Sequence, residues 1–225
     1  MKLLILRPEP GGSETAARAR AMGLEPVVAP LFRTKRLAAP AVDSGLYDAI
    51  LLTSANGARY APAGATGLPC FAVGESSAAA ARAAGFGEVR AGSCDGAAAA
   101  AMMAAAGVKR ALHLCGRDHL AVEAAGVLIE RRIVYAAEPV AHERFEGPAV
   151  AMLHSARGAA RFAELAGARA GIAVAAISAA AAAAAGDGWA AKAVAAAPRD
   201  QALLELAAKL CNHGFEAVRD SGDGL

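Results

Sequence analysis

Short apolar runs alternate with longer alanine-rich stretches along most of the chain. The apolar runs are rich in Val, Ile and Leu, which is typical of strands buried on both faces. They lie at 3–6, 26–30, 49–53, 70–73, 88–91, 111–115, 133–136, 149–153, 173–177 and 191–195. The stretches that follow most of them predict helices at 13–22, 56–61, 76–84, 95–106, 119–131, 157–166, 179–186 and 200–211. This alternation predicts an α/β fold, in which parallel sheets are covered by helices.

The pattern also occurs twice. The segment 70–104 has a parallel at 173–210, and the strand-helix-strand segment predicted at 3–32 has one at 111–140. Two domain arrangements fit this repeat. The first is a tandem pair divided near residue 110, and the second is a nested pair in which 37–140 is inserted between 1–36 and 141–225. Periodicity alone slightly favours the tandem pair, because it needs no return crossing of the chain.

The most similar pieces of the two halves are turns. "LLTSANGARY" at 51–60 is echoed by "MLHSARGAARF" at 152–162, and each is an apolar run that ends in a serine-containing turn. In parallel sheets such turns share one edge, where the N–H groups of helix N-termini favour anions. The predicted turns are Arg7–Ser13, Ser54–Gly57, Gly74–Ser77, Gly116–Asp118, Ser155–Gly158 and Ser178. Three lie in each half of the nested arrangement, so a ligand with several carboxylates is expected.

Composition excludes several classes of function. The net charge of the 225 residues is +2 and the charges are interspersed, so no nucleic-acid partner is expected. The first apolar run is too short for a signal-peptide core, and no stretch approaches about 20 strongly apolar residues. We therefore expect a cytoplasmic protein with no membrane partner. The alanine runs are interpreted as helices, since Ala is the best helix former.

No metal or cofactor is predicted. Cys70, Cys94, Cys115 and Cys211 form no Cys-x-x-Cys pair, and buried free thiols are the simpler interpretation. The histidines never fall at the spacing that a helical metal site needs. "GESSAA" at 74–79 lacks the glycine pattern of dinucleotide-binding loops.

Five pieces, taken in order, carry a resemblance to a known family. They are "LILRPEPGGSETAARARAMGLEPVVAPLF", "YDAILLTSANGARY", "FAVGESSAAAARAAGF", "LCGRDHLAVEAAGVLIERRIVYAAEPV" and the second serine-containing turn. Together they resemble uroporphyrinogen-III synthase over nearly all of 1–210. The resemblance implies the nested arrangement, with two similar α/β domains joined by a two-stranded connection at about 31–38 and 135–143.

The same resemblance implies a lyase of tetrapyrrole and heme biosynthesis. Such an enzyme cyclises hydroxymethylbilane, held in the cleft between its domains, and inverts ring D to give uroporphyrinogen III. The substrate carries an acetate and a propionate on every ring, and backbone N–H groups and hydroxyls can bind these carboxylates in a nearly neutral protein. A monomer is expected. A transient contact with the enzyme that makes the unstable substrate is left open.

Site residues follow from the turns and from the resemblance. The predicted substrate-binding residues are Arg7, Ser54, Gly74, Ser77, Gly116, Arg117, Ser155 and Ser178. Tyr135 matches the family's cleft tyrosine and is the predicted proton donor to the leaving hydroxyl, in an assisting role. Each residue also has a structural interpretation: the serines as helix N-caps, Gly74 as a turn residue, the arginines as ion-pair partners and Tyr135 as a core aromatic.

The sequence departs from the family pattern at two turns. Ser178 stands where a Gly is usual and Ala181 where a hydroxyl is usual, while His154 replaces a small or hydroxyl residue. These departures favour the alternative function, a non-catalytic two-lobed sensor or binding module for a polycarboxylate. The enzyme is favoured by the intact Ser54, Ser77, Ser155, Arg117 and Tyr135. The tail at 212–225 is rich in Gly and Asp and is expected to be disordered.

Overall fold

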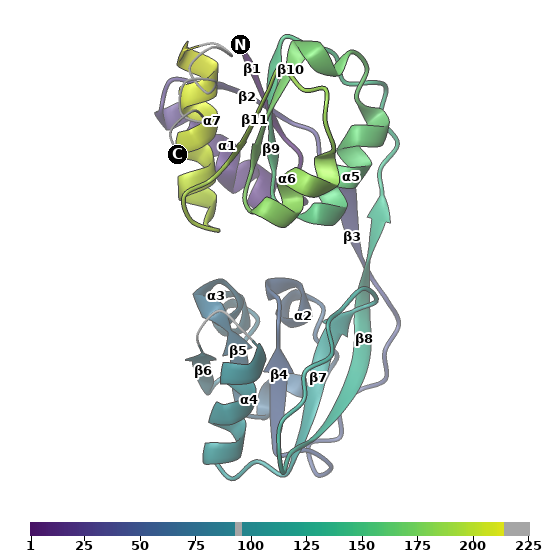
Figure 1. Cartoon of the computed structure of the whole chain (residues 1–225). Helices are drawn as coiled ribbons and strands as arrows, with labels where there is room; N and C mark the ends of the chain where they lie inside the picture. The colour runs from purple at the N-terminus through teal and green to yellow at the C-terminus, as the bar shows by residue number, and fades with distance from the viewer. Residues whose placement is uncertain (93–95, 214–225) are drawn as a thin grey trace. The chain divides into compact units, whose positions relative to one another are not determined.

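The computed structural model describes residues 1–92 and 96–213 of the chain (Figure 1). The chain divides into two compact units. The split unit comprises Met1–Arg33 and Pro139–Leu225, and the continuous unit comprises Thr34–Glu138. The chain passes between them within β3 (Phe32–Arg36) and within β8 (Leu128–Pro139), which are neighbours in one sheet. The predicted fold class, with two helix-covered parallel sheets and a two-stranded connection, is confirmed.

The split unit is built on a five-stranded sheet with the order β11-β10-β9-β1-β2. Its strands are β1 (Lys2–Ile5), β2 (Glu25–Val28), β9 (Ala149–Leu153), β10 (Ile172–Ala176) and β11 (Ala191–Val194). All four pairings are parallel. Because β1 pairs with β9, residues from the start of the chain share a sheet with residues almost 150 positions later.

Helices cover both faces of this sheet. One face carries α1 (Gly11–Ala21) and α7 (Asp200–His213), and the other carries α5 (Ala156–Leu165) and α6 (Ala179–Ala185) (Figure 1). A short 3-10 turn, η2 (Arg169–Gly171), leads into β10. Side chains alternate along β1, so Leu3 and Ile5 enter the core under α1 and α7, while Leu4 packs with Phe162 of α5 in the opposite core.

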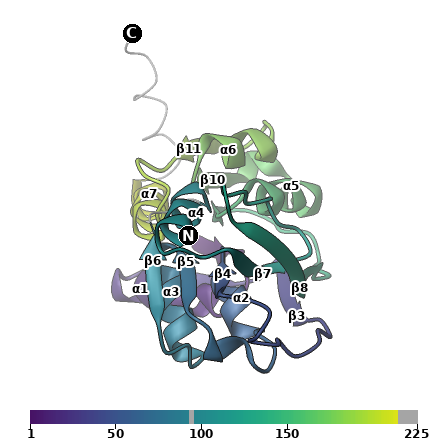
Figure 2. The ribbon, with the colours of Figure 1, turned by 90° about the horizontal axis from the view of Figure 1, so that it is seen from below.

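The continuous unit is built on a six-stranded sheet with the order β3-β8-β7-β4-β5-β6 (Figure 2). Its other strands are β4 (Ala49–Leu52), β5 (Cys70–Val73), β6 (Val89–Gly92) and β7 (Arg110–Gly116). The pairings of β4 with β5 and β7, of β5 with β6 and of β7 with β8 are parallel. The carboxyl ends of these strands therefore lie at a common edge.

The helices α2 (Ala55–Arg59) and α3 (Gly74–Ala83) cover one face of this sheet, and α4 (Gly96–Ala105) covers the other (Figure 2). A 3-10 turn, η1 (Ala65–Gly67), lies before β5. Ile50, Leu52 and Leu114 are fully buried on the first face, whereas Leu51, Phe71 and Met103 form the core under α4. Each unit thus has its own core on either side of its own sheet.

One predicted helix is wrong. The segment 119–131 contains no helix: Ala124 and Val127 form an isolated bridge, and the long strand β8 begins at Leu128. Gly126 has a φ of +76°, a conformation that ends helical periodicity. From there the chain pairs with β7, so strand pairing overrides the helical appearance of the alanines. The segment 111–140 therefore does not repeat the strand-helix-strand form of 3–32.

Part of the predicted tail belongs to a helix. Asn212 and His213 lie in α7, while the remainder of the tail, 214–225, lies outside the described residues, as does Cys94. Among the described residues, no helix is long and apolar enough to span a membrane.

The separate cores give a testable prediction about fragments. A fragment of residues 34–138 keeps the order β8-β7-β4-β5-β6 and should unfold cooperatively, with dispersed proton NMR signals. A fragment of residues 1–110 lacks β9, the partner of β1, and almost all of β7, the partner of β4, so it should not fold. A cooperative melting transition for the 1–110 fragment together with an unfolded 34–138 fragment would contradict this prediction.

Candidate functional site

The turn after β4 supplies the first site residues of the continuous unit. Ser54 is the N-cap of α2, and its hydroxyl accepts a hydrogen bond from the backbone N–H of Gly57 at 3.3 Å. The structural interpretation of Ser54 as an N-cap therefore holds. A serine hydroxyl that accepts one hydrogen bond still has its own proton to donate. For Ser54 the neighbouring group within reach is the hydroxyl of Tyr135, at 2.9 Å.

Tyr135 reaches Ser54 because of a β-bulge. Along β8, Ile133 pairs with Cys115, but the next residue of β7, Gly116, pairs with Tyr135, so that Val134 is skipped. Side chains alternate along a strand, and a bulge returns the following side chain to the same face. Val134 and Tyr135 accordingly both pack against the core under α2 and α3. This is the face on which Ser54 lies.

Gly116 provides the space for the Tyr135 ring. A Cβ atom at Gly116 would lie 2.6 Å from Cζ and 2.9 Å from the hydroxyl oxygen of Tyr135. The backbone is fixed at the same point, since the N–H of Arg117 donates to the carbonyl of Tyr135 at 2.9 Å. Gly116 and Arg117 thus hold the tyrosine in place through the main chain.

Burial is the main reason that the pKa of Tyr135 is raised above its ordinary value. The hydrogen bond with Ser54 lowers this pKa, and the negative charge of Asp118 raises it. Tyr135 is therefore a protonated phenol at neutral pH. Its hydroxyl can donate a hydrogen bond or a proton.

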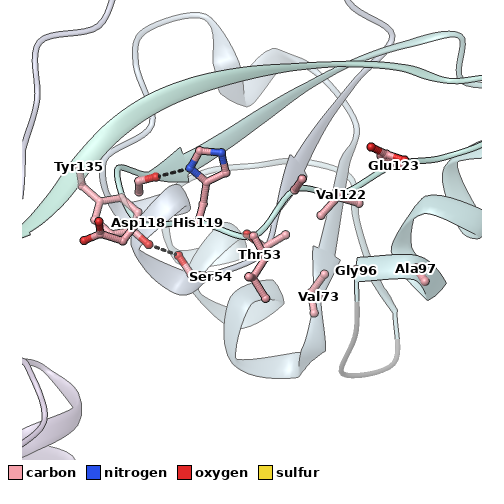
Figure 3. A pocket seen from close by; sticks show the side chains of 13 residues that line it. Thr53, Ser54, Val73, Gly96, Ala97, Asp118, His119, Val122, Glu123 and Tyr135 are labelled. Carbon is pink, nitrogen blue, oxygen red and sulfur yellow. Dashed lines mark hydrogen bonds between the residues drawn. The ribbon is translucent and has the colours of Figure 1, made fainter. Parts of the chain in front are cut away.

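These groups line a cavity of about 550 Å³ at the carboxyl edge of the sheet (Figure 3). The other lining residues come from the ends of β4, β5 and β7, the start of α4 and the segment before β8: Thr53, Val73, Gly96, Ala97, Gly116, Asp118, His119, Leu120, Ala121, Val122 and Glu123. His119 is oriented by its Nδ1, 2.9 Å from the carbonyl oxygen of Gly116. Hydroxyls, an imidazole and two carboxylates therefore face one space with apolar walls.

A buried histidine lies next to this cavity. His113 of β7 is fully buried, and its Nε2 is 2.8 Å from the hydroxyl of Thr53. Its Nδ1 is buried and has no hydrogen-bond partner within the described residues. Burial, together with the nearby His119 and Arg131, lowers the pKa of His113 to about 4. The imidazole is therefore neutral at physiological pH.

Three predicted residues of this unit do not line the cavity. Gly74 opens α3 with a φ of +74°, and open space surrounds its Cα, so the backbone alone requires glycine there. Ser77 is buried within α3 and is 5% exposed. The Arg117 residue is exposed. The turn Gly116–Asp118 also opens no helix, so the anion site expected from a helix N-terminus does not exist at that turn.

The split unit holds the remaining predicted residues. Ser155 and Ser178 are the N-caps of α5 and α6, and each hydroxyl accepts the N–H of the residue three positions later. Their structural interpretation therefore holds as well. Ser155 lies beside a small cavity of about 50 Å³ together with Arg7 and His154.

Arg7 is engaged in a cluster around Asp200. The Asp200 carboxylate accepts hydrogen bonds from Arg7 at 2.9 Å, from Nε2 of His154 at 2.7 Å, from the hydroxyl of Thr15 at 3.1 Å and from Arg18. Burial raises the pKa of Asp200, but the hydrogen bonds and positive charges outweigh it, and the pKa lies well below the ordinary value. The guanidinium of Arg7, which was predicted to bind substrate, is thus already paired with the carboxylate of Asp200.

Sequence reasoning missed Thr53, His113, His119 and Asp200. Thr53 ends an apolar run and resembles a strand residue, and His113 stands within one. Only the position of Thr53 directly before Ser54 could have singled it out. No described group of three or more His, Cys, Asp or Glu side chains is arranged to hold a metal ion.

The fold and the site define a class: α/β proteins of two parallel-sheet units, with polar groups gathered at the carboxyl edges of the strands. Comparison of sequences is more specific. The sequence model of the family uroporphyrinogen-III synthase HemD matches residues 13–205. The chain therefore belongs to the uroporphyrinogen-III synthase family, as its sequence pieces predict.

Solved structures with the same fold are distant in sequence. Uroporphyrinogen-III synthetase from Helicobacter pylori shares 14% identity over 93% of this chain and 98% of its own, with a TM-score of 0.68. A mutant uroporphyrinogen III synthase from Thermus thermophilus shares 15% identity over 98% and 99%, with a TM-score of 0.50. No curated protein sequence matches the chain. The predicted enzyme class, a lyase of heme biosynthesis, agrees with the family, and no finding favours the sensor module.

The buried His113 predicts acid sensitivity of the continuous unit. As the pH falls below about 6.5, the unfolded chain binds a proton at this histidine, while the folded unit does not until about pH 4. The stability from the neutral imidazole is therefore complete above the unfolded pKa and is lost on acidification between these values. The loss amounts to about 3 kcal/mol.

Urea unfolding at several pH values tests this, with the tyrosine signal as the probe, because all three tyrosines lie in the continuous unit and the single tryptophan, Trp189, lies in the split unit. His113→Gln cannot titrate and should remove most of the pH dependence over that interval. Equal pH slopes for the two proteins would show that His113 is not the source.

Proposed function

We propose that this chain cyclises hydroxymethylbilane to uroporphyrinogen III and that the reacting end of the substrate binds in the 550 Å³ cavity of the continuous unit. The observation that carries the assignment of the site is the pair of hydroxyls of Ser54 and Tyr135, 2.9 Å apart on the cavity wall. Family membership supports the reaction.

The reaction begins with loss of the terminal hydroxyl as water, which needs one proton and leaves an azafulvene cation. The substituted carbon of ring D attacks this cation and forms a spiro intermediate. The spiro intermediate then fragments and recloses with ring D inverted, and a proton is released. Spontaneous closure gives the isomer without inversion. The protein must therefore hold the linear substrate in a geometry that prevents this easier bond from forming.

Tyr135 is the proposed donor of the first proton. The hydroxyls of Ser54 and Tyr135 are 2.9 Å apart, and we assign Ser54, which also accepts the N–H of Gly57, as the donor to the oxygen of Tyr135. The phenol proton of Tyr135 is then free for the leaving hydroxyl. The raised pKa of Tyr135 makes this group a weak acid, which suits assistance by a hydrogen bond or partial proton transfer.

The charges of the cavity suit the intermediate. Asp118 and Glu123 both line it, and Glu123 lies at the end away from Tyr135 (Figure 3). Carboxylates near a developing cation stabilise it, although both of these residues are exposed and water screens their charge. The neutral hydroxyl of Thr53 can bind a carboxylate of the substrate. We propose Arg7, Gly74, Ser77, Arg117, Ser155 and Ser178 as further substrate contacts only through their main chain or after rearrangement of the Asp200 cluster.

We also propose a cytoplasmic monomer that acts without a cofactor. Three cysteines, Cys70, Cys115 and Cys211, are free thiols, which agrees with a reducing compartment. Each unit buries its own core, so neither needs a second chain to do so. A transient contact with the enzyme that supplies the substrate would protect an unstable molecule from spontaneous closure.

The basic test of function uses freshly generated hydroxymethylbilane and separates the oxidised isomers I and III. The chain should produce isomer III in proportion to its concentration. Isomer I alone, at every concentration of the protein, would refute the proposed function.

Tyr135→Phe should slow formation of isomer III by about 100-fold or less, because an assisting acid is worth at most the lower part of the usual range for general acid catalysis. The matched control is Tyr60→Phe, which removes a hydroxyl bonded to Thr34 at 2.9 Å in the same unit. Initial rates and melting temperatures are measured for both. A normal rate with lowered stability for Tyr135→Phe would make Tyr135 a structural residue.

Gly116→Ala should displace the Tyr135 ring, since the new methyl group would lie 2.6 Å from its Cζ. We expect a rate at least as low as that of Tyr135→Phe and a loss of about 1–3 kcal/mol in unfolding free energy from overpacking. Gly67→Ala is the control, because a Cβ there meets nothing within 4 Å. If the Gly116→Ala and Gly67→Ala variants are equally active, the ring does not depend on this glycine.

A further inference from the structure

His113 is a buried polar group that the proposed mechanism does not use. It lies on β7 opposite Leu51 of β4, on the face of the sheet that α4 covers. Its ring has no exposed surface, yet its Nε2 reaches the hydroxyl of Thr53 at 2.8 Å. Thr53 lines the cavity (Figure 3). The histidine therefore meets the site at two side chains: Thr53, through a hydrogen bond, and His119, whose ring lies edge-on to it at a centroid distance of 6.1 Å.

The hydrogen-bonding capacity of the pair limits its arrangement. A neutral imidazole carries one N–H, and the threonine hydroxyl has one proton to donate and two lone pairs with which to accept. If the proton were on Nδ1, Thr53 would donate to Nε2, and a buried N–H would have no acceptor within the described residues. Buried N–H groups without a partner are rare and destabilising. With the proton on Nε2, the atom without a partner is Nδ1, which then carries a lone pair and no proton.

We propose that His113 is a positioning residue: its Nε2–H donates to Thr53, so that the hydroxyl proton of Thr53 is directed into the cavity as a donor to a carboxylate of the substrate. The imidazole N–H then occupies one lone pair of the Thr53 hydroxyl from the core side. The cavity wall then presents an O–H donor that cannot turn toward the core. A positive charge is not needed, which agrees with a site that keeps its histidine neutral.

This inference rests on the proposed function, because it assigns an acetate or propionate carboxylate as the partner of Thr53. It predicts an effect on substrate affinity rather than on the chemical step. A hydroxyl bonded to a carboxylate contributes enough that its loss should raise KM by about 10- to 100-fold, with kcat little changed. Tyr135→Phe, in contrast, should act on kcat.

The experiment compares four variants of the full chain with initial-rate kinetics on hydroxymethylbilane. Thr53→Val removes the hydroxyl at nearly constant volume, and Thr53→Ser keeps it. His113→Leu removes the donor, and His113→Gln places an amide N–H near the position of Nε2. We expect Thr53→Val and His113→Leu to raise KM alike, their combination to be no worse than either, and Thr53→Ser and His113→Gln to stay within a few-fold of the wild type.

A second measurement keeps the inference testable if His113→Leu does not fold. The ¹⁵N chemical shifts of the imidazole in the unmodified protein distinguish a protonated Nε2 from a protonated Nδ1. A protonated Nδ1 would overturn the proposal. A KM that Thr53→Val raises and His113→Leu leaves unchanged would also overturn it, because the orienting step would then be unnecessary.

Failure of the inference is distinct from failure of the proposed function. If the wild type produces no isomer III, the function fails, whatever the tautomer of His113. If the wild type produces isomer III, and both His113→Leu and Thr53→Val do so with wild-type kinetics, the function stands and the positioning role is refuted.

Discussion

The pairing of β8 with β7 is the constraint on which the site depends. The strands remain in register from Arg110 to Cys115, and the bulge at Gly116 then brings Tyr135 onto the face that holds Ser54. Without this one-residue shift, alternation would direct the tyrosine toward α4, away from the hydroxyl it contacts. A glycine opposite the ring is the steric condition for the same arrangement.

The two units use similar turns for different purposes. In the continuous unit, the hydroxyls that follow β4 face a cavity, and a neutral histidine lies behind them. In the split unit, the corresponding region is closed by Asp200, which binds Arg7, Arg18 and His154 and fixes the start of α7 against β1 and β9. The side chains of Asp200 and Arg7 are 20% and 31% exposed, so water still reaches this cluster. In the split unit the predicted ligand Arg7 is therefore paired with a carboxylate of the same chain.

Neutral groups dominate the cavity wall that is proposed to bind carboxylates. In this proposal the hydroxyl of Thr53 binds an anion without a strong positive field, and the two carboxylates that also line the cavity, Asp118 and Glu123, face the cationic intermediate. A near-neutral protein can thus serve a highly charged substrate and a positively charged intermediate in one place.

The sequence by itself determined the fold class, the family and most element positions. Buried parallel strands and alanine-rich helices have local signatures, and the helices predicted at 13–22, 76–84 and 200–211 differ from α1, α3 and α7 by at most two residues at either end. The sequence could also suggest Ser54 and Tyr135, through a turn and a family resemblance. It failed at 119–131, where alanines imply a helix and strand pairing with β7 decides otherwise.

Only the tertiary structure decided which strands pair and which side chains meet. The pairing of β1 with β9, the bulge at Gly116 and the contacts of His113 with Thr53 and of Arg7 with Asp200 all join residues distant in sequence. Local propensity carries no information on such pairs, because their free energy comes from burial and from hydrogen bonds that exist only once the sheets have formed. For the same reason Arg7 could not be recognised as engaged, nor His113 as part of the site.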